Sequence, residues 1–248
     1  MSHSAWYIGC EKDEVGEAAL LTGDRARIDR IAEHLKDARI LPENRGLRTV
    51  TGSRNGVRVT ATAFGMGGPI AAIVLHELFD LGVRTFIRVG TAMAMPPAKL
   101  GDMLLADGAY SNDGASRTYA PNGYPAVADF DLAARLRTSL GTRSLSWRAG
   151  LFGTYDGFYT ESFALSEGEA KMIDKTREET QRLGLIATDM ETAPLMIAGR
   201  MLGAKVASLC LGTVDGITQA KLDPDQLATR ERDMFEAALD ALTDVRSP

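Results

Sequence analysis

The alternation of apolar and polar positions along the chain follows two periods, one typical of helices and the other of strands. In residues 25–36 apolar side chains recur three and four positions apart, which predicts an amphipathic helix. Two runs of strand-like pattern, 47–52 and 57–63, flank Asn55-Gly56, a pair that accepts the positive φ angles of a tight turn. This part of the chain therefore predicts a helix followed by a β-hairpin.

Helix and strand patterns continue to alternate to the end of the chain, with a long loop expected at 112–125. Further helices are expected at residues 70–81, 129–140, 167–182, 191–202 and 224–245. Further strands are expected at residues 85–89, 102–109, 146–152, 187–190 and 204–214. Because several of these strands are nearly continuous apolar runs, they should be covered on both faces. The pattern predicts a single α/β domain over residues 1–248, a three-layer αβα fold whose mixed, mostly parallel central sheet is flanked by helices.

Composition narrows the possible functions. The chain has 248 residues, and no Pro/Gly/Ser-rich linker or repeat divides it. A net charge of −5 argues against a nucleic-acid-binding surface. Neither an apolar stretch of about 18 residues nor a signal-peptide layout is visible, so we expect a cytoplasmic protein without a membrane segment. Two cysteines and three histidines indicate neither a disulfide framework nor a zinc site, which leaves a small polar substrate as the default partner.

Two arginines stand at separate loops where strands are expected to end, which is where ligands bind in such sheets, and a third lies at 44–46. Arg27 follows the glycine turn at Gly23, a helix start whose backbone N–H groups favour an anion, although a solvated helix cap is the alternative. Arg88 ends an apolar strand, and a buried guanidinium needs a partner, so an internal salt bridge is the alternative to a ligand. With Arg45 between Asn44 and Gly46, the three cations together suggest an oxyanion such as phosphate.

Carboxylates stand at two further strand ends. In residues 188–192, Asp189 and Glu191 flank Met190, a pattern that suits paired sugar hydroxyls and an apolar sugar face, or simply caps a helix. Asp215 ends the last strand, and a partly desolvated carboxyl there should have a raised pKa and could donate a proton, unless it only forms an Asp-Gly turn. The glycine turn at 65–69 lacks the lysine of a phosphate-binding P-loop and by itself is only a tight turn.

Taken together these segments resemble the nucleoside phosphorylase family that includes hexameric purine nucleoside phosphorylases and uridine phosphorylases. The likeness runs from Trp6 to the last helix. Its markers, in the family's order, are Gly23-Asp24 with Arg27, Asn44-Arg45-Gly46, 65–69, Arg88-Val89-Gly90-Thr91, 125–130, 156–159, Asp189-Met190-Glu191 and Val214-Asp215-Gly216.

The resemblance implies a role for each matching residue. It implies that phosphate, as co-substrate, is held by Gly23, Arg27, Arg88, Thr91 and, from a neighbouring subunit, Arg45. It implies that the ribose is held by Met66, Met190 and Glu191, with Tyr7 at the position of a histidine that many members donate across the subunit interface to the 5′-hydroxyl. Phe158 is implied to lie against the base, and Asp215 to protonate N7 of a leaving purine. The implied assembly is a homo-oligomer, a hexamer built from dimers, and neither a metal nor a redox cofactor is implied.

The substrate is less well specified by the resemblance. Asp189 replaces a glutamate, and the segment 160–163 lacks the glutamine and arginine with which uridine phosphorylases hold uracil, whereas Asp215 occupies the acid position of the purine enzymes. We therefore expect phosphorolysis of purine nucleosides to free base and (deoxy)ribose 1-phosphate. The first alternative is a phosphorylase for uridine or a 5′-modified pyrimidine nucleoside, which the segment 112–121 and Tyr7 favour. The others are a hydrolytic nucleosidase of the same fold and a non-enzymatic nucleoside-binding protein.

Overall fold

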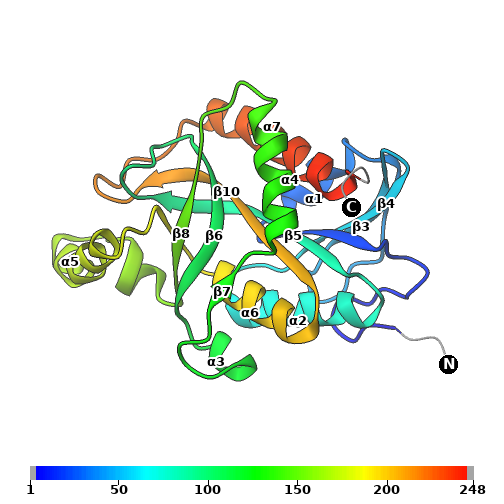
Figure 1. The fold of residues 1–248 in the computed structure, drawn as a ribbon, viewed down its shortest axis with the longest axis horizontal. Coiled ribbons are helices and arrows are strands. Elements are labelled where there is room, and N and C mark those ends of the chain that lie inside the picture. The colour runs from blue at the N-terminus through cyan, green and yellow to red at the C-terminus, as the bar shows by residue number, and fades with distance from the viewer. Residues whose placement is uncertain (1–3, 245–248) are drawn as a thin grey trace.

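Successive residues of the central strands face opposite sides of the sheet, so each strand contributes to two hydrophobic cores. In the computed structural model, which describes residues 4–244 (Figure 1), Ala19 and Leu21 of β1 (Ala18–Thr22) lie in one core. Ala18 and Leu20 of the same strand lie in the other. This two-sided burial confirms the predicted three-layer arrangement.

One mixed sheet forms the middle layer. Its other strands are β2 (Lys36–Ile40), β3 (Thr49–Arg54), β4 (Val57–Ala63), β5 (Thr85–Ala94), β6 (Met103–Asn112), β7 (Ala126–Val127), β8 (Trp147–Tyr155), β9 (Ala187–Asp189) and β10 (Lys205–Asp215). The order is β10-β6-β8-β9-β5-β1-β4-β3-β2, and β10 also pairs with β5. Strand β10 pairs with β5 and β6, β6 pairs with β8, and β9 joins β8 to β5. These five strands therefore close into a ring.

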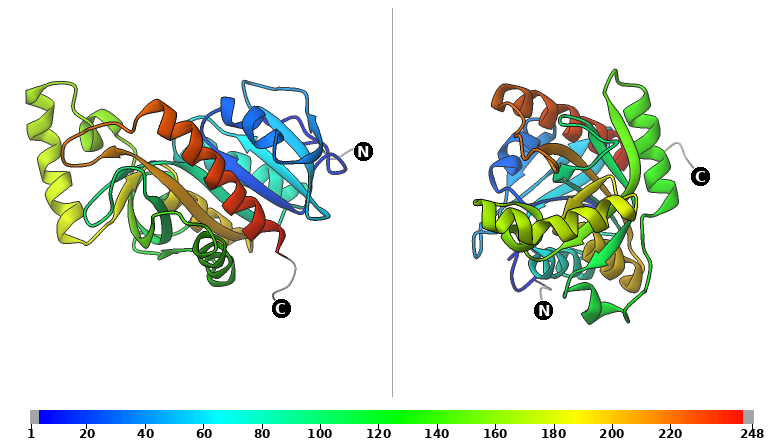
Figure 2. Two further views of the ribbon diagram at one scale, coloured as in Figure 1. Left: turned by 90° about the horizontal axis from the view of Figure 1, so that it is seen from above. Right: turned by 90° about the vertical axis from the view of Figure 1, so that its left-hand side faces the viewer.

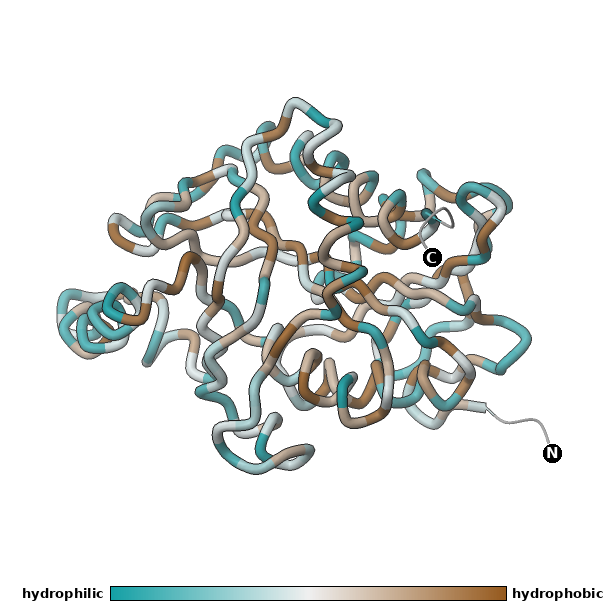
Figure 3. The backbone as a smooth tube through the Cα atoms, viewed as in Figure 1, coloured by the Kyte–Doolittle hydropathy of each residue, from teal (hydrophilic) through white to brown (hydrophobic). Residues whose placement is uncertain are grey.

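Helices cover both faces of the sheet. They are α1 (Ala26–Ala32), α2 (Gly68–Asp80), α3 (Ser116–Tyr119), α4 (Phe130–Gly141), the π-helix η1 (Phe158–Ser162), α5 (Glu167–Arg182), α6 (Thr192–Leu202) and α7 (Pro224–Thr243). Helices α2 and α6 pack on one face, whereas α1, α4 and α7 pack on the other, with α7 lying lengthwise along it (Figures 1 and 2). Helix α5 lies at one end of the molecule, and hydrophilic residues cover most of its surface (Figure 3).

Four expectations from the sequence need correction. The helix predicted at 25–36 ends at Ala32, and residues 36–40 form β2, an exposed edge strand whose charged residues hide the strand pattern. Strand β1 was not predicted, because five buried residues without alternation carry little periodic signal. The expected loop at 112–125 contains α3. Strand β5 runs on to Ala94, which places Arg88 inside the strand rather than at its end. The predicted end of the last helix at Val245 lies outside the described residues.

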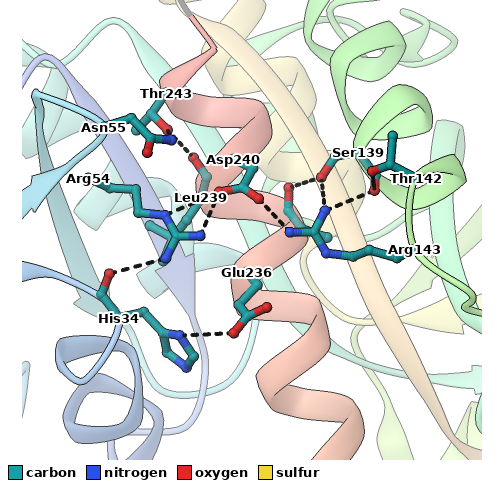
Figure 4. A network of polar contacts seen from close by, with 11 residues as sticks. His34, Arg54, Asn55, Ser139, Thr142, Arg143, Glu236, Leu239, Asp240 and Thr243 are labelled. Carbon is teal, nitrogen blue, oxygen red and sulfur yellow. Dashed lines mark hydrogen bonds and ion pairs between the residues drawn. The ribbon is translucent and has the colours of Figure 1, made fainter.

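The hairpin between β3 and β4 is confirmed, and a clamp of side chains fixes it to the helical layer. Asn55 and Gly56 adopt φ values of 52° and 79°, as the turn requires. Figure 4 shows that Asp240 of α7 accepts hydrogen bonds from Arg54 of the hairpin (2.7 Å from Nη2) and from Arg143, which follows α4. Burial opposes the charge of Asp240, but the hydrogen bonds from Arg143 and Arg54 hold the pKa of this carboxyl below its usual value.

Candidate functional site

Arg88 is the centre of a buried cluster of charges. Its Nη2 donates to Glu191 Oε2 at 2.5 Å, and its Nη1 lies 3.2 Å from Asp189 Oδ2. Nη1 also donates to the thiol of Cys210 at 2.5 Å. Burial opposes the charge, but Cys210, Asp189 and Glu191 raise the pKa of Arg88, so its guanidinium stays protonated. The sequence therefore correctly indicated a buried cation that needs partners, and the internal salt bridge that was the alternative is present.

The close packing around Arg88 depends on one glycine. A Cβ atom at Gly90 would lie 2.7 Å from Arg88 Nη1 and 2.8 Å from Cζ. Any larger residue at position 90 would displace the guanidinium. The Gly90-Thr91 segment thus lets the arginine fold back along its own strand.

Glu191 connects this cluster to the glycine turn before α2. Its Oε1 accepts a hydrogen bond from the backbone N–H of Gly67 at 2.8 Å, while its Oε2 faces Arg88. Gly67 has a φ of 100°, a conformation that side chains rarely adopt. Glu191 therefore has a fixed orientation between a cation and a backbone donor, and the turn at 65–69 has a role beyond tight reversal of the chain.

Asp189 faces the interior rather than the solvent. Its Oδ1 accepts from Thr154 Oγ1 at 2.8 Å, and its Oδ2 accepts from the hydroxyl of Thr192 at 2.6 Å and from the backbone N–H of the same residue at 3.0 Å. Thr192 in turn contacts Ser208 Oγ at 2.9 Å. Both oxygens of Asp189 are thus engaged, Oδ1 by the Thr154 hydroxyl and Oδ2 by Thr192 and Arg88, and the side chain is buried, so this carboxylate orients the cluster.

A cavity of about 620 Å³ opens beside the cluster. Met66, Gly67 and Met190 line it, and so do Gly114 and Asp156. Glu191 reaches this wall through its hydrogen bond with Gly67. Met66 is 84% exposed, and Met190 is half-buried. The predicted sugar-binding residues Met66, Met190 and Glu191 are therefore brought together, and the cavity is large enough for a small ligand.

The predicted phosphate-binding residues fall into separate groups. Gly23 follows β1, whose Leu21 pairs with Arg88 across the sheet, and its carbonyl accepts from Gly65 N at 3.1 Å. Arg27 is buried, not solvated, and its Nε donates to Glu231 of α7 at 2.7 Å. Gly23 lies near the Arg88 cluster, whereas within residues 4–244 no hydrogen bond or ion pair joins Arg27 to that cluster. Thr91 is half-buried in β5, three residues after Arg88.

Tyr7 and Arg45 form a pair on the outside of α2. The Arg45 guanidinium lies 5.0 Å from the centre of the Tyr7 ring, and Arg45 is exposed. The backbone N–H of Tyr7 donates to Glu77 Oε1 of α2 at 2.8 Å. Within residues 4–244, no hydrogen bond or ion pair links this pair to Arg88 or Glu191. The structure thus brings Tyr7 and Arg45 together with each other but not with the rest of the predicted site in the same chain.

The expected raised pKa of Asp215 is wrong. Its Oδ1 accepts the backbone N–H groups of Thr218 at 2.7 Å and Ile217 at 2.9 Å. These hydrogen bonds, that from Thr218 above all, hold the pKa of Asp215 below its usual value, because the carboxyl is only partly buried. The Asp-Gly turn that was the alternative is therefore the geometry seen here.

Phe158 lies in an aromatic cluster at the start of η1. It stacks on Phe163 at 5.7 Å between ring centres and meets Tyr159 edge-on at 5.0 Å. Phe158 is 36% exposed, so one face of this cluster is available for a flat ligand. Single-turn π-helices occur frequently at functional sites.

Two residues of the site escaped sequence analysis. Glu231 and Cys210, the partners of Arg27 and Arg88, lie far from them in the sequence. Cys210 meets Arg88 because β5 and β10 pair in the register that sets Ser208 opposite Arg88. Strand register of this kind leaves no mark in a single sequence, so no signal would have identified these residues.

Within residues 4–244, no group of three or more His, Cys, Asp or Glu side chains is placed to hold a metal ion. None of the helices in this part of the chain combines the length and apolar character that crossing a membrane requires.

The chain is similar to known proteins over nearly its whole length. A model of the phosphorylase superfamily matches residues 17–243. A guanosine phosphorylase of Halorubrum lacusprofundi is 32% identical over 239 residues, which cover 94% of this chain and 94% of that protein. A uridine phosphorylase of Treponema pallidum is 31% identical, covering 83% of this chain and 80% of that protein. The crystal structure of uridine phosphorylase from Vibrio fischeri has a TM-score of 0.85 to this fold at 29% identity, with 98% of both chains covered.

Proposed function

The chain belongs to the phosphorylase superfamily, and from this premise we propose that it cleaves purine nucleosides with inorganic phosphate. It is an enzyme of the nucleoside phosphorylase family, a pentosyltransferase. The observation that carries the proposal is the Arg88–Glu191–Gly67 arrangement beside the cavity of about 620 Å³. It combines a cation for an oxyanion with a fixed carboxylate for sugar hydroxyls.

In the proposed reaction a phosphate oxygen attacks C1′ of the sugar. The bond from C1′ to the base breaks, its electron pair leaves with the base, and the products are the free base and a pentose 1-phosphate. Glu191 accepts hydrogen bonds from the sugar hydroxyls, while Met66 and Met190 pack on the sugar. Arg88, with Gly23, Arg27 and Thr91, holds the phosphate beneath the sugar, where its nucleophilic oxygen is oriented for attack. The residues require no metal or redox cofactor for these steps.

Asp215 is proposed as the acid that protonates N7 of the departing base. Because its pKa is low in the ligand-free protein, it must take up a proton from solvent when the bound base covers it. Desolvation by the base would raise the pKa of the carboxyl and so favour that uptake. The proton then neutralises the charge that develops on the leaving group.

Phosphorolysis is preferred to hydrolysis because of the arginines. A hydrolase that activates water has no reason to keep Arg27 and Arg88 as buried cations. Each costs free energy to bury and is tolerated here only with carboxylate partners. Phosphate supplies a dianion that can share these guanidinium groups.

The purine preference is the finer part of the proposal. It rests on Asp215 at the acid position, on the missing glutamine and arginine in 160–163, and on a relative named guanosine phosphorylase. A pyrimidine nucleoside is the second candidate, because several relatives of similar identity are named uridine phosphorylase. A cytoplasmic location stays a prediction.

We also propose that the active unit is at least a dimer, within a hexamer built from dimers. Tyr7 and Arg45 lie together on the outside of α2, away from Arg88 of the same chain. A second copy that presents this pair to the cavity would complete the phosphate and 5′-hydroxyl contacts.

The decisive experiment is turnover with and without phosphate. The protein is incubated with inosine, guanosine, adenosine or uridine, and free base and pentose 1-phosphate are followed by chromatography. We expect purine release only with phosphate. Base release of equal rate in phosphate-free buffer would instead indicate hydrolysis, and release from uridine alone would favour the second candidate.

A further inference from the structure

Glu161 of η1 is a carboxylate that the proposed reaction does not use. It lines a narrow cavity of about 10 Å³ together with Met93, Thr188 and Gly216. Thr188 and Gly216 are close neighbours in sequence of Met190 and Asp215, so two residues of the proposed site adjoin residues that line this cavity. Methionine side chains have three rotatable bonds, and Met93 can therefore repack to admit a larger group.

The orientation of the Glu161 carboxylate is fixed from both sides. Oε1 accepts from Asn112 Nδ2 at 3.1 Å, and Oε2 accepts from the backbone N–H of Gly157 at 2.8 Å. Gly157 permits this approach, since a Cβ atom there would lie 2.9 Å from Oε2 and 2.1 Å from Thr160 Oγ1. Gly157 adjoins Asp156, and Asn112 lies two residues before Gly114. Because Asp156 and Gly114 both line the large cavity, the Glu161 carboxylate is bonded to two segments that reach that cavity.

The charge of Glu161 is not neutralised by a cation. Among residues 4–244, no lysine, arginine or histidine forms an ion pair with it. Arg177, which lines the same cavity, is held by the carbonyl of Gly216 at 2.9 Å and by Asp174 at 2.7 Å. Each carboxylate oxygen has about two lone-pair sites, and one on each oxygen is used, so one acceptor site per oxygen remains.

We infer that Glu161 is a specificity-determining residue that binds the Watson–Crick edge of guanine, an inference that rests on the proposed function. Guanine presents two parallel donors on this edge, N1–H and the exocyclic amino group. A carboxylate with one free acceptor site on each oxygen matches them with two charge-assisted hydrogen bonds. Asn112 and Gly157 hold the carboxylate in position for this pairing.

The same carboxylate discriminates against other bases. Hypoxanthine offers only N1–H, so it forms one of the two bonds. Adenine has an unprotonated N1, whose lone pair faces a carboxylate oxygen. Uracil places its single N3–H between two carbonyl oxygens, which repel the carboxylate. Loss of each charge-assisted bond should lower affinity by about 10- to 100-fold.

The test measures binding and turnover separately. Calorimetry without phosphate compares guanosine, inosine and adenosine on the wild-type protein, on Glu161→Gln and on the control Glu167→Gln, which changes an exposed carboxylate of α5. We expect guanosine to bind most tightly to the wild type, followed by inosine and then adenosine. Glu161→Gln should weaken guanosine about 10- to 100-fold and reduce the ratio of guanosine to adenosine affinity, whereas Glu167→Gln should leave all three unchanged.

The outcomes separate this inference from the proposed function. If guanosine and adenosine bind the wild type equally, or if Glu161→Gln leaves their ratio unchanged while circular dichroism shows a folded protein, the role of Glu161 is wrong. The wild-type ranking does not depend on whether the variant folds. If the ranking is as expected but no nucleoside is cleaved with phosphate, the proposed reaction is wrong and the binding role of Glu161 is retained.

Discussion

The guanidinium of Arg88 has two roles that compete for the same N–H donors: it compensates buried carboxylates, and it is proposed to bind phosphate. In the ligand-free protein it is shared among Glu191, Asp189 and Cys210, and together these groups keep two buried carboxylates compensated. A phosphate would have to share the same donors. The residue that is proposed to bind the nucleophile therefore also stabilises the folded protein, and the two effects need different substitutions to be separated.

Arg88→Ala should unfold more easily, because it leaves Asp189 and Glu191 buried without a cation. We expect a loss of about 3–5 kcal/mol in the free energy of unfolding, measured by urea denaturation. Arg88→Lys keeps the charge but not the planar fork, so it should lose less stability while the KM for phosphate rises. A KM for phosphate that is equal in the wild type and Arg88→Lys would contradict the phosphate role.

Asp215→Asn tests proton donation without breaking the turn. The amide oxygen of asparagine can still accept from Ile217 and Thr218, so the loop should keep its geometry. Loss of the acid should lower kcat for inosine by about 100-fold or more. Thermal stability should fall only slightly, because the amide loses the charge but keeps the two hydrogen bonds at this partly exposed turn. An unchanged kcat with inosine would rule out Asp215 as the general acid.

Helix α7 connects distant elements through one side chain near its middle and another near its C-terminal end. Near its middle Glu231 binds Arg27 beside the site, and toward its end Asp240 holds Arg54 of the hairpin and Arg143 after α4. Figure 4 shows that the second group joins three elements at one carboxylate. The stability that this clamp adds depends on Asp240 being ionised.

The clamp predicts a pH dependence with a defined sign. The pKa of Asp240 is lower in the folded protein than in the unfolded chain, so its stabilisation is present above the unfolded-state pKa of about 3.9 and is lost as pH falls through the lower folded-state pKa. Asp240→Asn should therefore destabilise the protein by about 1–2 kcal/mol at pH 6 and by less at pH 3.5.

Urea unfolding at both pH values measures this difference. Asp13→Asn, which changes an exposed carboxylate in a turn, is the control and should show no comparable pH effect. If the difference in the free energy of unfolding between wild type and Asp240→Asn is the same at pH 6 and pH 3.5, ionisation of Asp240 does not stabilise the clamp.

At the scale of the whole molecule, the residues of the proposed site are separated within one chain. Arg88, Glu191 and the large cavity lie together, while Tyr7 and Arg45 lie on the outer side of α2. The proposed assembly would bring the two groups together, because in a two-fold dimer each copy can present its Tyr7 and Arg45 to the cavity of the other.

Mixing two inactive variants tests the shared site. Arg45→Ala and Asp215→Asn are each expected to be poorly active alone. When they are unfolded together and refolded, a mixed dimer has one site with both residues intact and one with both replaced. Random pairing should then restore about a quarter of the wild-type activity. No gain over the separate variants, or a monomer by light scattering, would contradict a shared site.

The sequence by itself determined the fold class and the residue types of the site. Periodic apolar patterns gave most helices and the Asn55-Gly56 hairpin, because burial of one face repeats at the period of each element. Arg88 interrupts an apolar run that is expected to be buried, so the sequence also indicated a buried cation. The sequence could not show the partners of that cation, nor the lowered pKa of Asp215.

Only the tertiary structure decided which groups meet. Strand register sets Cys210 beside Arg88, and the packing of α7 sets Glu231 beside Arg27, contacts between residues far apart in the chain. The turn after β10 points two amides at Asp215, so its carboxylate is stabilised instead of desolvated. Such effects depend on distances between elements. The pattern of apolar residues along the sequence predicts which groups are buried, but not which buried group meets which other.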